Sequence, residues 1–149
     1  MLNLDPNEME RYLKKWQEIL RLKDWDIIIH PVEKEWRKTG DIKIDRDDHN
    51  AVLMINVFNP KQTNLEGLII HELLHLKLWD MDQMIEGLIN LVYGTEEADP
   101  RREFAYTQFM TTLESTVQDL AKGYLQEFGE DKTRSFGRIM PEVMQEIGE

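Results

Sequence analysis

The chain has 149 residues, of which 32% are charged and 41% hydrophobic, and this length suits one globular core. Its formal net charge of −11 argues against a phosphate backbone or an anionic membrane surface, so we expect neither nucleic acid nor a membrane as partner. The absence of cysteine excludes disulfides, thiolate catalysis and cysteine-based zinc ribbons. No targeting signal or long apolar run occurs, so the expected location is the cytoplasm.

The first part of the chain predicts one helix and three strands. Asp5-Pro6 has the character of a helix start, and apolar residues then recur at intervals of three and four up to about Leu22. The β-branched run 25–32 predicts a strand. Residues 40–45 alternate between apolar and polar, and residues 51–58 are more continuously apolar, so these two segments predict a hairpin.

The segment Leu65 to Trp79 is apolar in almost every direction around a helix, which predicts a helix buried on nearly all sides. Thr63 and Glu66 have the spacing of a capping box at its start. Glu66 and Lys77 are the only side chains expected to form a narrow stripe toward solvent.

Three further segments follow this helix. Residues 80–82 predict a break, residues 84–93 a short helix, and residues from about 101 to 128 a long helix. The tail 130–149 predicts either a short docked helix or a mobile segment. We therefore expect one domain over 1–129 of the α+β class, with a small, mostly antiparallel three-stranded sheet between the first helix and the later helices.

The buried helix carries the pattern H-E-x-x-H as His71, Glu72 and His75. Residues four apart lie on one face of a helix, so both imidazoles can bind one metal ion, while Glu72 lies beside them as a base. Two imidazoles and a carboxylate inside an apolar helix are costly unless a cation satisfies them. The pattern therefore predicts metal ligands His71 and His75 and a catalytic Glu72.

A catalytic zinc site normally has three protein ligands, and no histidine follows His75. An acidic residue of the long helix is the natural third ligand. Glu114 lies at the margin of that helix's apolar face, in its middle, whereas Glu103 lies near the start, where the helix dipole favours an acid anyway. Glu114 is the preferred ligand, and Glu96, Glu97 and Glu103 remain as alternatives.

His71-Glu72-Leu73-Leu74-His75, followed some forty residues later by Glu114 on a helix, resembles the gluzincin branch of zincin-type metallopeptidases. Within that branch it is similar to the small single-domain ImmA/IrrE-like group. The resemblance implies a minimal zincin-like fold in which an edge strand before the metal helix pairs with an extended peptide. In this chain that strand would be Ala51 to Phe58.

The predicted function is that of a zinc-dependent metallopeptidase, with one Zn²⁺ ion and a protein or peptide substrate. Glu72 would accept a proton from the metal-bound water and return it to the leaving amine. A metal-binding fold without turnover, acting as a regulatory module, and a hydrolase of another amide or ester are the alternatives. Candidates for stabilising the oxyanion are Tyr93, Arg101, Tyr106 and His30, and candidates for holding the imidazoles are Asn56, Asp80, Asp82 and Asn90.

Overall fold

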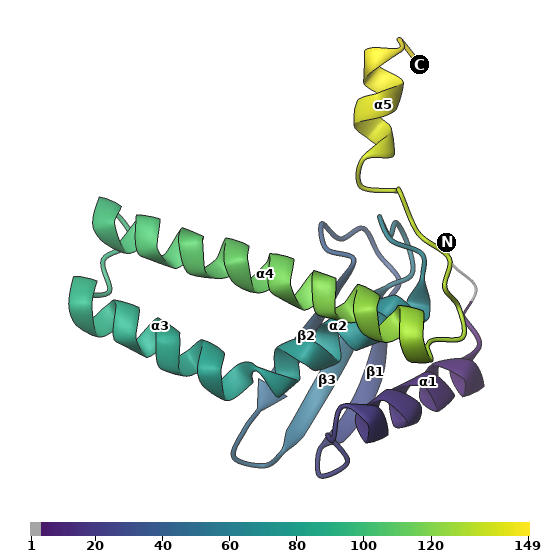
Figure 1. Ribbon diagram of the computed structural model, residues 1–149, viewed down its shortest axis with the longest axis horizontal. Coiled ribbons are helices and arrows are strands. Elements are labelled where there is room, and N and C mark those ends of the chain that lie inside the picture. Colours follow the sequence, from purple (N-terminus) through teal and green to yellow (C-terminus); the bar gives the residue numbers. More distant parts are fainter. Residues whose placement is uncertain (1–3) are drawn as a thin grey trace.

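The structure is a computed structural model that describes residues 4–149, and within them it has five helices and a three-stranded sheet (Figure 1). The α+β class is confirmed. The elements are α1 (Pro6–Ile19), β1 (Asp26–Val32), β2 (Gly40–Asp45), β3 (Asn50–Asn56), α2 (Leu65–Lys77), α3 (Trp79–Tyr93), α4 (Pro100–Phe128) and α5 (Met140–Glu146). No helix in this part of the chain is both long enough and apolar enough to cross a membrane.

The sheet has the strand order β1-β3-β2 and is mixed. The predicted hairpin is confirmed, since β2 and β3 pair antiparallel, with Ile42 opposite Leu53. The prediction of a mostly antiparallel sheet is wrong, because β1 and β3 pair parallel. β2 runs antiparallel to β1, and one strand position lies between them. The turn after β2 then places β3 in that position, parallel to β1.

This strand order also overturns the expected edge strand. The segment predicted to pair with a peptide, Ala51 to Phe58, corresponds to β3, which is hydrogen-bonded on both sides. The free edges of the sheet belong to β1 and β2. β2 lies against α2, and at Gly40 the two elements are so close that an added Cβ would lie 2.9 Å from Leu68 Cδ1. The absence of a side chain at Gly40 thus gives room for the close approach of this strand to the helix that carries the H-E-x-x-H pattern.

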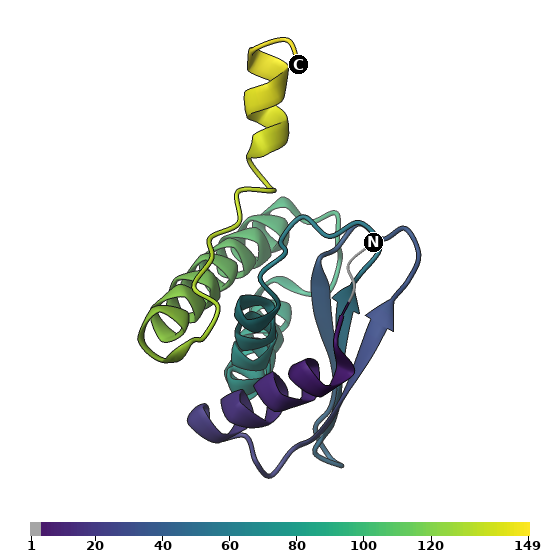
Figure 2. The same cartoon turned by 90° about the vertical axis from the view of Figure 1, so that its right-hand side faces the viewer.

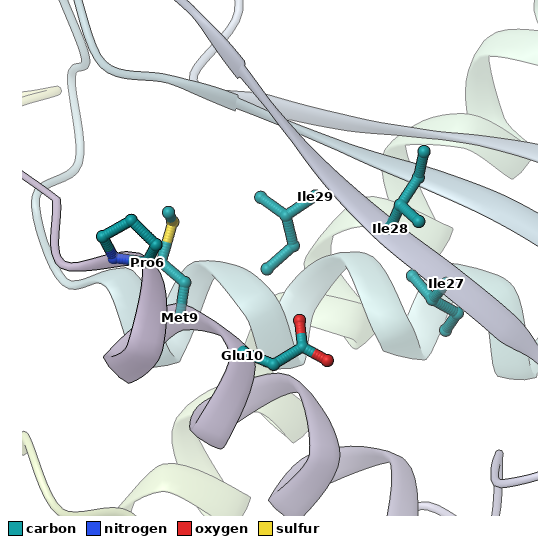
Figure 3. Close-up of a pocket in the computed structure, with 6 residues that line it drawn as sticks. All are labelled: Pro6, Met9, Glu10, Ile27, Ile28 and Ile29. Atoms are coloured by element: carbon teal, nitrogen blue, oxygen red, sulfur yellow. The ribbon is translucent and has the colours of Figure 1, made fainter.

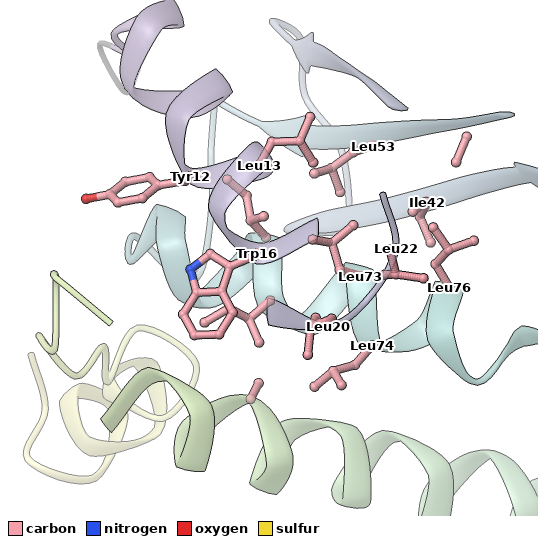
Figure 4. Close-up of a cluster of buried hydrophobic side chains, with 14 of the residues drawn as sticks. Tyr12, Leu13, Trp16, Leu20, Leu22, Ile42, Leu53, Leu73, Leu74 and Leu76 are labelled. Carbon is pink, nitrogen blue, oxygen red and sulfur yellow. The ribbon is translucent and has the colours of Figure 1, made fainter. Parts of the chain in front are cut away.

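The helices α1, α2 and α4 lie on one side of the sheet (Figure 2). Their apolar side chains and those of β3 form one core (Figure 4). The predicted apolar face of α1 is confirmed, and α2 is buried as expected. The most completely buried side chains of this core include Leu13, Trp16, Leu53, Ile55, Ile69, Ile70, Leu73 and Val117.

The prediction that Glu66 lies in a solvent-facing stripe of α2 is wrong, because its side chain is fully buried, at 0% exposure. Its carboxylate accepts hydrogen bonds from Lys15 Nζ and Trp16 Nε1, at 2.9 and 2.8 Å, and from the backbone N–H groups of Glu130 and Asp131, at 2.8 and 3.0 Å. It therefore ties α1 and the segment after α4 to the first turn of α2.

The start of α2 also differs from the predicted capping box. Asn64, not Thr63, is the N-cap, and its side chain accepts the N–H of Gly67 at 2.9 Å. The Asn64 amide group also donates to backbone oxygens of Asp131 and Thr133. One side chain thus caps the helix and holds the chain segment that leaves α4.

The predicted break after α2 is shorter than expected. Only Leu78 separates α2 from α3, and Asp80 and Asp82 lie in the first turn of α3, where the helix dipole favours acids. α3 and the first half of α4 lie side by side and extend beyond the sheet (Figure 1). In the tail, α5 is helical, and all of its side chains are exposed.

Candidate metal centre

Both imidazoles of the H-E-x-x-H pattern project from the same face of α2. His71 and His75 are one turn apart, with ring centroids 5.1 Å apart, and each side chain is only 16% exposed. Packing of α2 against α1, β2 and α4 fixes the direction of this face, which looks toward the middle of α4. The sequence therefore places two nitrogen ligands by helical spacing and core burial alone.

Glu114, in the middle of α4, supplies the third group. Its Oε2 lies 3.3 Å from His71 Nε2 and its Oε1 lies 2.8 Å from His75 Nε2. Neighbouring positions of α4, Leu113 and Val117, are buried in the core, and this packing turns the Glu114 carboxylate toward α2. The three donor atoms lie within 4.8 Å of one another, so a single ion could contact all of them.

This donor set fits zinc. Zinc takes two histidines and one glutamate in many catalytic sites, and bond lengths of about 2.0–2.2 Å in a tetrahedron put neighbouring donor atoms roughly 3.3–3.5 Å apart. The 3.3 Å contact of Glu114 Oε2 with His71 Nε2 matches that spacing, and the 2.8 Å contact of Oε1 with His75 Nε2 is about half an ångström shorter than it.

The charges of the three groups are coupled. Hydrogen bonds from His71 and His75 hold the pKa of Glu114 far below its ordinary value. Burial by itself lowers the pKa of His71, but the hydrogen bond to Glu114 and the nearby charge of Glu72 outweigh it, so this pKa is raised. Glu114 is thus ionised at neutral pH and ready to bind a cation.

Glu72 lies beside this cluster and is only 6% exposed. Burial raises its pKa to about 7, with the two imidazoles acting in the opposite direction. Within residues 4–149, no hydrogen bond or ion pair engages its carboxylate, unlike Glu66 on the same helix. A nearly buried acid without such a partner has the properties of a proton acceptor and donor rather than those of a structural group.

The residue that orients His71 is Gln118, which was not among the candidates from the sequence. Gln118 Oε1 lies 2.7 Å from His71 Nδ1, so an Nδ1–H can donate to the amide oxygen, and Nε2 is the ring nitrogen directed toward Glu114. Gln118 follows Glu114 by four residues, on the same face of α4. That helical spacing was the signal that could have identified it.

The predicted imidazole partners form other contacts. Asp80 pairs with Arg46, Asn90 accepts from Arg102, and Asn56 donates to Trp36 and Lys38 carbonyl groups. Asp82 accepts from Gln83 at the exposed start of α3. None of these four is paired with His71 or His75 in the described chain.

The alternative third ligands lie elsewhere. Glu103 is in the first turn of α4, eleven residues before Glu114 and therefore about 16 Å along the axis. Glu96 and Glu97 lie in the connection between α3 and α4. The structure brings Glu114, and none of these three, into contact with the imidazoles.

The candidate oxyanion groups are not gathered at the cluster. Arg101 lies over the ring of Tyr93 where α3 meets α4, and Arg102 lies over Tyr106, two turns of α4 before Glu114. His30 is on β1, which β3 separates from β2. No protein-family model, curated protein or solved structure matches the chain.

Proposed function

We propose that this chain is a zinc-dependent metallopeptidase of the gluzincin type, akin to the small ImmA/IrrE-like group. The observation that carries the proposal is the convergence of His71, His75 and Glu114 donor atoms within 4.8 Å, with the nearly buried Glu72 beside them. Two helices far apart in sequence supply these groups, and each group is directed by packing of its helix against the core.

His71, His75 and Glu114 would hold the ion, and Gln118 would keep His71 in the tautomer that presents Nε2. A bound zinc ion supplies Lewis-acid chemistry, lowering the pKa of a water molecule and polarising a carbonyl group. Glu72 would take the proton of the attacking water on its carboxylate and deliver it to the amide nitrogen that leaves. The raised pKa of Glu72, about 7, suits a group that both accepts and returns a proton near neutral pH.

The free edge of β2 is the place for an extended peptide substrate. Asn56 N–H donates to Thr39 O, so odd-numbered residues face β3, and Ile42 and Ile44 turn their backbone groups to the free edge. The Ile42 N–H donates to its neighbour Asp41 Oδ1 at 2.8 Å. A peptide carbonyl would replace that carboxylate, adding a strand beside α2.

The test compares casein or peptide cleavage by the wild type and by Glu72→Gln, with zinc content measured in both. Wild type is expected to cleave, and Glu72→Gln, which keeps the size of the side chain but cannot accept the proton, is expected to bind zinc without cleaving. Asp82→Asn is the matched control, because Asp82 is a half-buried residue of α3 whose carboxylate accepts from Gln83 and is not paired with the imidazoles. It should retain full activity.

The alternative is a metal-binding module without turnover. If both wild type and Glu72→Gln bind zinc and neither cleaves any peptide of a diverse library, the peptidase proposal is wrong and the module remains. Equal cleavage by both proteins would remove Glu72 from the chemistry. A protein that binds no zinc would contradict both readings.

A further inference from the structure

The outer edge of β1 carries unpaired backbone groups in a defined order. Asp26 N–H donates to His49 O at 2.8 Å, and Val32 O accepts from Val57 N at 3.1 Å, so even-numbered residues of β1 face β3. Successive residues of a strand turn their N–H and C=O groups to opposite sides. The backbone groups of Ile27, Ile29 and Pro31 therefore point away from β3, to the edge where no other strand of the described chain lies.

This row of groups has two natural ends. At one end, Trp25 has its backbone groups satisfied: its N–H donates to Leu22 O at 3.1 Å, and its C=O accepts from Gln17 Nε2 at 2.9 Å. At the other end, Pro31 has no N–H to donate. The pairs of donor and acceptor that remain available are those of Ile27 and Ile29, and their midpoint is Ile28.

We infer that two copies of this chain associate through β1, with the strands antiparallel and a twofold axis beside Ile28. In this register Ile27 of each copy is opposite Ile29 of the other, and the four outward N–H groups all find carbonyl acceptors. A twofold contact of this kind is self-complementary and closed. It joins two three-stranded sheets into one of six strands.

The side chains of β1 match this register as well. Asp26 of each copy would lie opposite His30 of the other, in a non-hydrogen-bonded pair, where side chains approach most closely. The imidazole N–H can donate to the carboxylate. Ile28, which is 65% exposed on the open face of the sheet, would pack against its own copy at the axis. The parallel register would instead place like residues opposite each other and lose the Asp26–His30 pair.

A cavity of about 310 Å³ lies along the same edge, between β1 and α1 (Figure 3). Its lining includes Pro6, Met9 and Ile29, and Ile27 and Ile29 pack partly against the core from this side. The isoleucine side chains of an added strand would project here. The interface therefore has apolar contact on both faces of the new strand pair.

The net charge of −11 opposes association of two copies, but this repulsion is screened beyond roughly 8 Å at physiological salt. Within the strand pair, each Asp26 carboxylate would lie opposite an imidazole and not opposite another carboxylate. The proposed dimer contact does not involve the metal centre, because β2, which lies against α2, is at the opposite edge of the sheet from β1.

Sedimentation equilibrium of the full chain at physiological salt tests the inference. Wild type is expected to dimerise. Ile28→Lys, at an exposed position, should retain the fold by circular dichroism and raise the dimer dissociation constant at least about tenfold, because it sets like charges opposite each other. Lys43→Glu, an exposed change on β2, is the control and should leave the dissociation constant unchanged.

Exchanging the residues at positions 26 and 30 tests the strand register itself. His30→Asp places two carboxylates opposite each other and Asp26→His two imidazoles, so each should weaken the dimer. The double variant restores the pair with its members exchanged and should recover the wild-type dissociation constant. A wild type that stays monomeric at its highest soluble concentration overturns the inference. So does a dimer insensitive to Ile28→Lys, or a double variant no better than the weaker single one.

Discussion

Replacing Glu66 by alanine removes the acceptor that joins α1, α2 and the segment after α4. Its carboxylate receives four hydrogen bonds, two from α1 side chains and two from the backbone at residues 130–131. A truncated side chain leaves all four donors without this partner. The variant should therefore be markedly less stable than the wild type.

The size of the stability loss depends on whether each of the four donors can find another hydrogen-bond acceptor. Trp16 is fully buried, so its indole N–H loses its acceptor without gaining water, at a cost of about 1–3 kcal/mol. The backbone donors at residues 130–131 can bond water, at a net cost of about 1 kcal/mol each. Lys15, 25% exposed, can turn to solvent. The free energy of unfolding should fall by about 3–5 kcal/mol, the range found when a buried ion pair is broken.

Urea unfolding at pH 7 measures this change, and the melting temperature should fall by roughly 6–20 °C in a domain of this size. Glu18→Ala is the control, since Glu18 is an exposed residue of α1 whose contact with Lys23 is on the surface. Its free energy of unfolding should equal that of the wild type within error. A loss below about 1 kcal/mol for Glu66→Ala would refute the reasoning, because the buried hydrogen bonds would then contribute no more than surface contacts.

Three further predictions concern the metal centre and the fold. Gln118→Leu should lower zinc affinity by about 10–100-fold in a chelator competition, while Gln118→Glu, which keeps an acceptor, should not; equal affinities would contradict the role of Gln118. Burial raises the pKa of Glu66, but its hydrogen bonds outweigh burial and lower it below the unfolded value. Its stabilisation is thus complete above pH about 4.3 and lost as pH falls through the lowered folded pKa, so the stability gap between wild type and Glu66→Gln should narrow in acid; a constant gap would contradict this. Gly40→Val should destabilise the chain by about 1–3 kcal/mol in urea unfolding, because its Cβ meets Leu68, whereas Gly87→Ala, with open space around it, should not destabilise it; equal effects would contradict the close approach.

Much of the fold follows from local pattern. The face of α1 with Met9, Tyr12, Leu13 and Trp16 is buried as its spacing of three and four predicts. The hairpin of β2 and β3 follows from alternation and a polar turn. These elements depend on interactions between residues near in sequence or on the apolar period of a single helix. Both features can be recognised in the sequence alone.

The direction of β1 could not be predicted in the same way. Residues 33–39 connect β1 to β2, and such a connection can place β2 next to β1 or one strand position away. The outcome depends on how much apolar surface each pairing buries, which no short stretch of the sequence shows. The structure leaves a gap of one strand, which β3 fills. The assignment of the free edge to Ala51–Phe58 failed for this reason.

Glu66 and Gln118 show a second limit of prediction from sequence, because their partners lie on other elements. Helical spacing places Glu66 with Lys77 in a narrow polar stripe of an otherwise apolar helix surface, but it cannot reveal that Lys15, Trp16 and the backbone after α4 donate to Glu66. Gln118 likewise gains its role only when α4 lies across α2. Glu114 was accessible to sequence reasoning because its apolar neighbours already place it at the edge of the core.

The central claim is that His71, His75 and Glu114 bind one zinc ion. Its most direct test is the zinc content and affinity of the purified chain, measured by elemental analysis and chelator competition, beside Glu114→Ala. We predict one zinc per wild-type chain and a large loss of affinity in Glu114→Ala, with the fold retained. Wild-type protein that takes up no zinc, or a Glu114→Ala variant that binds it with unchanged affinity, would contradict the claim.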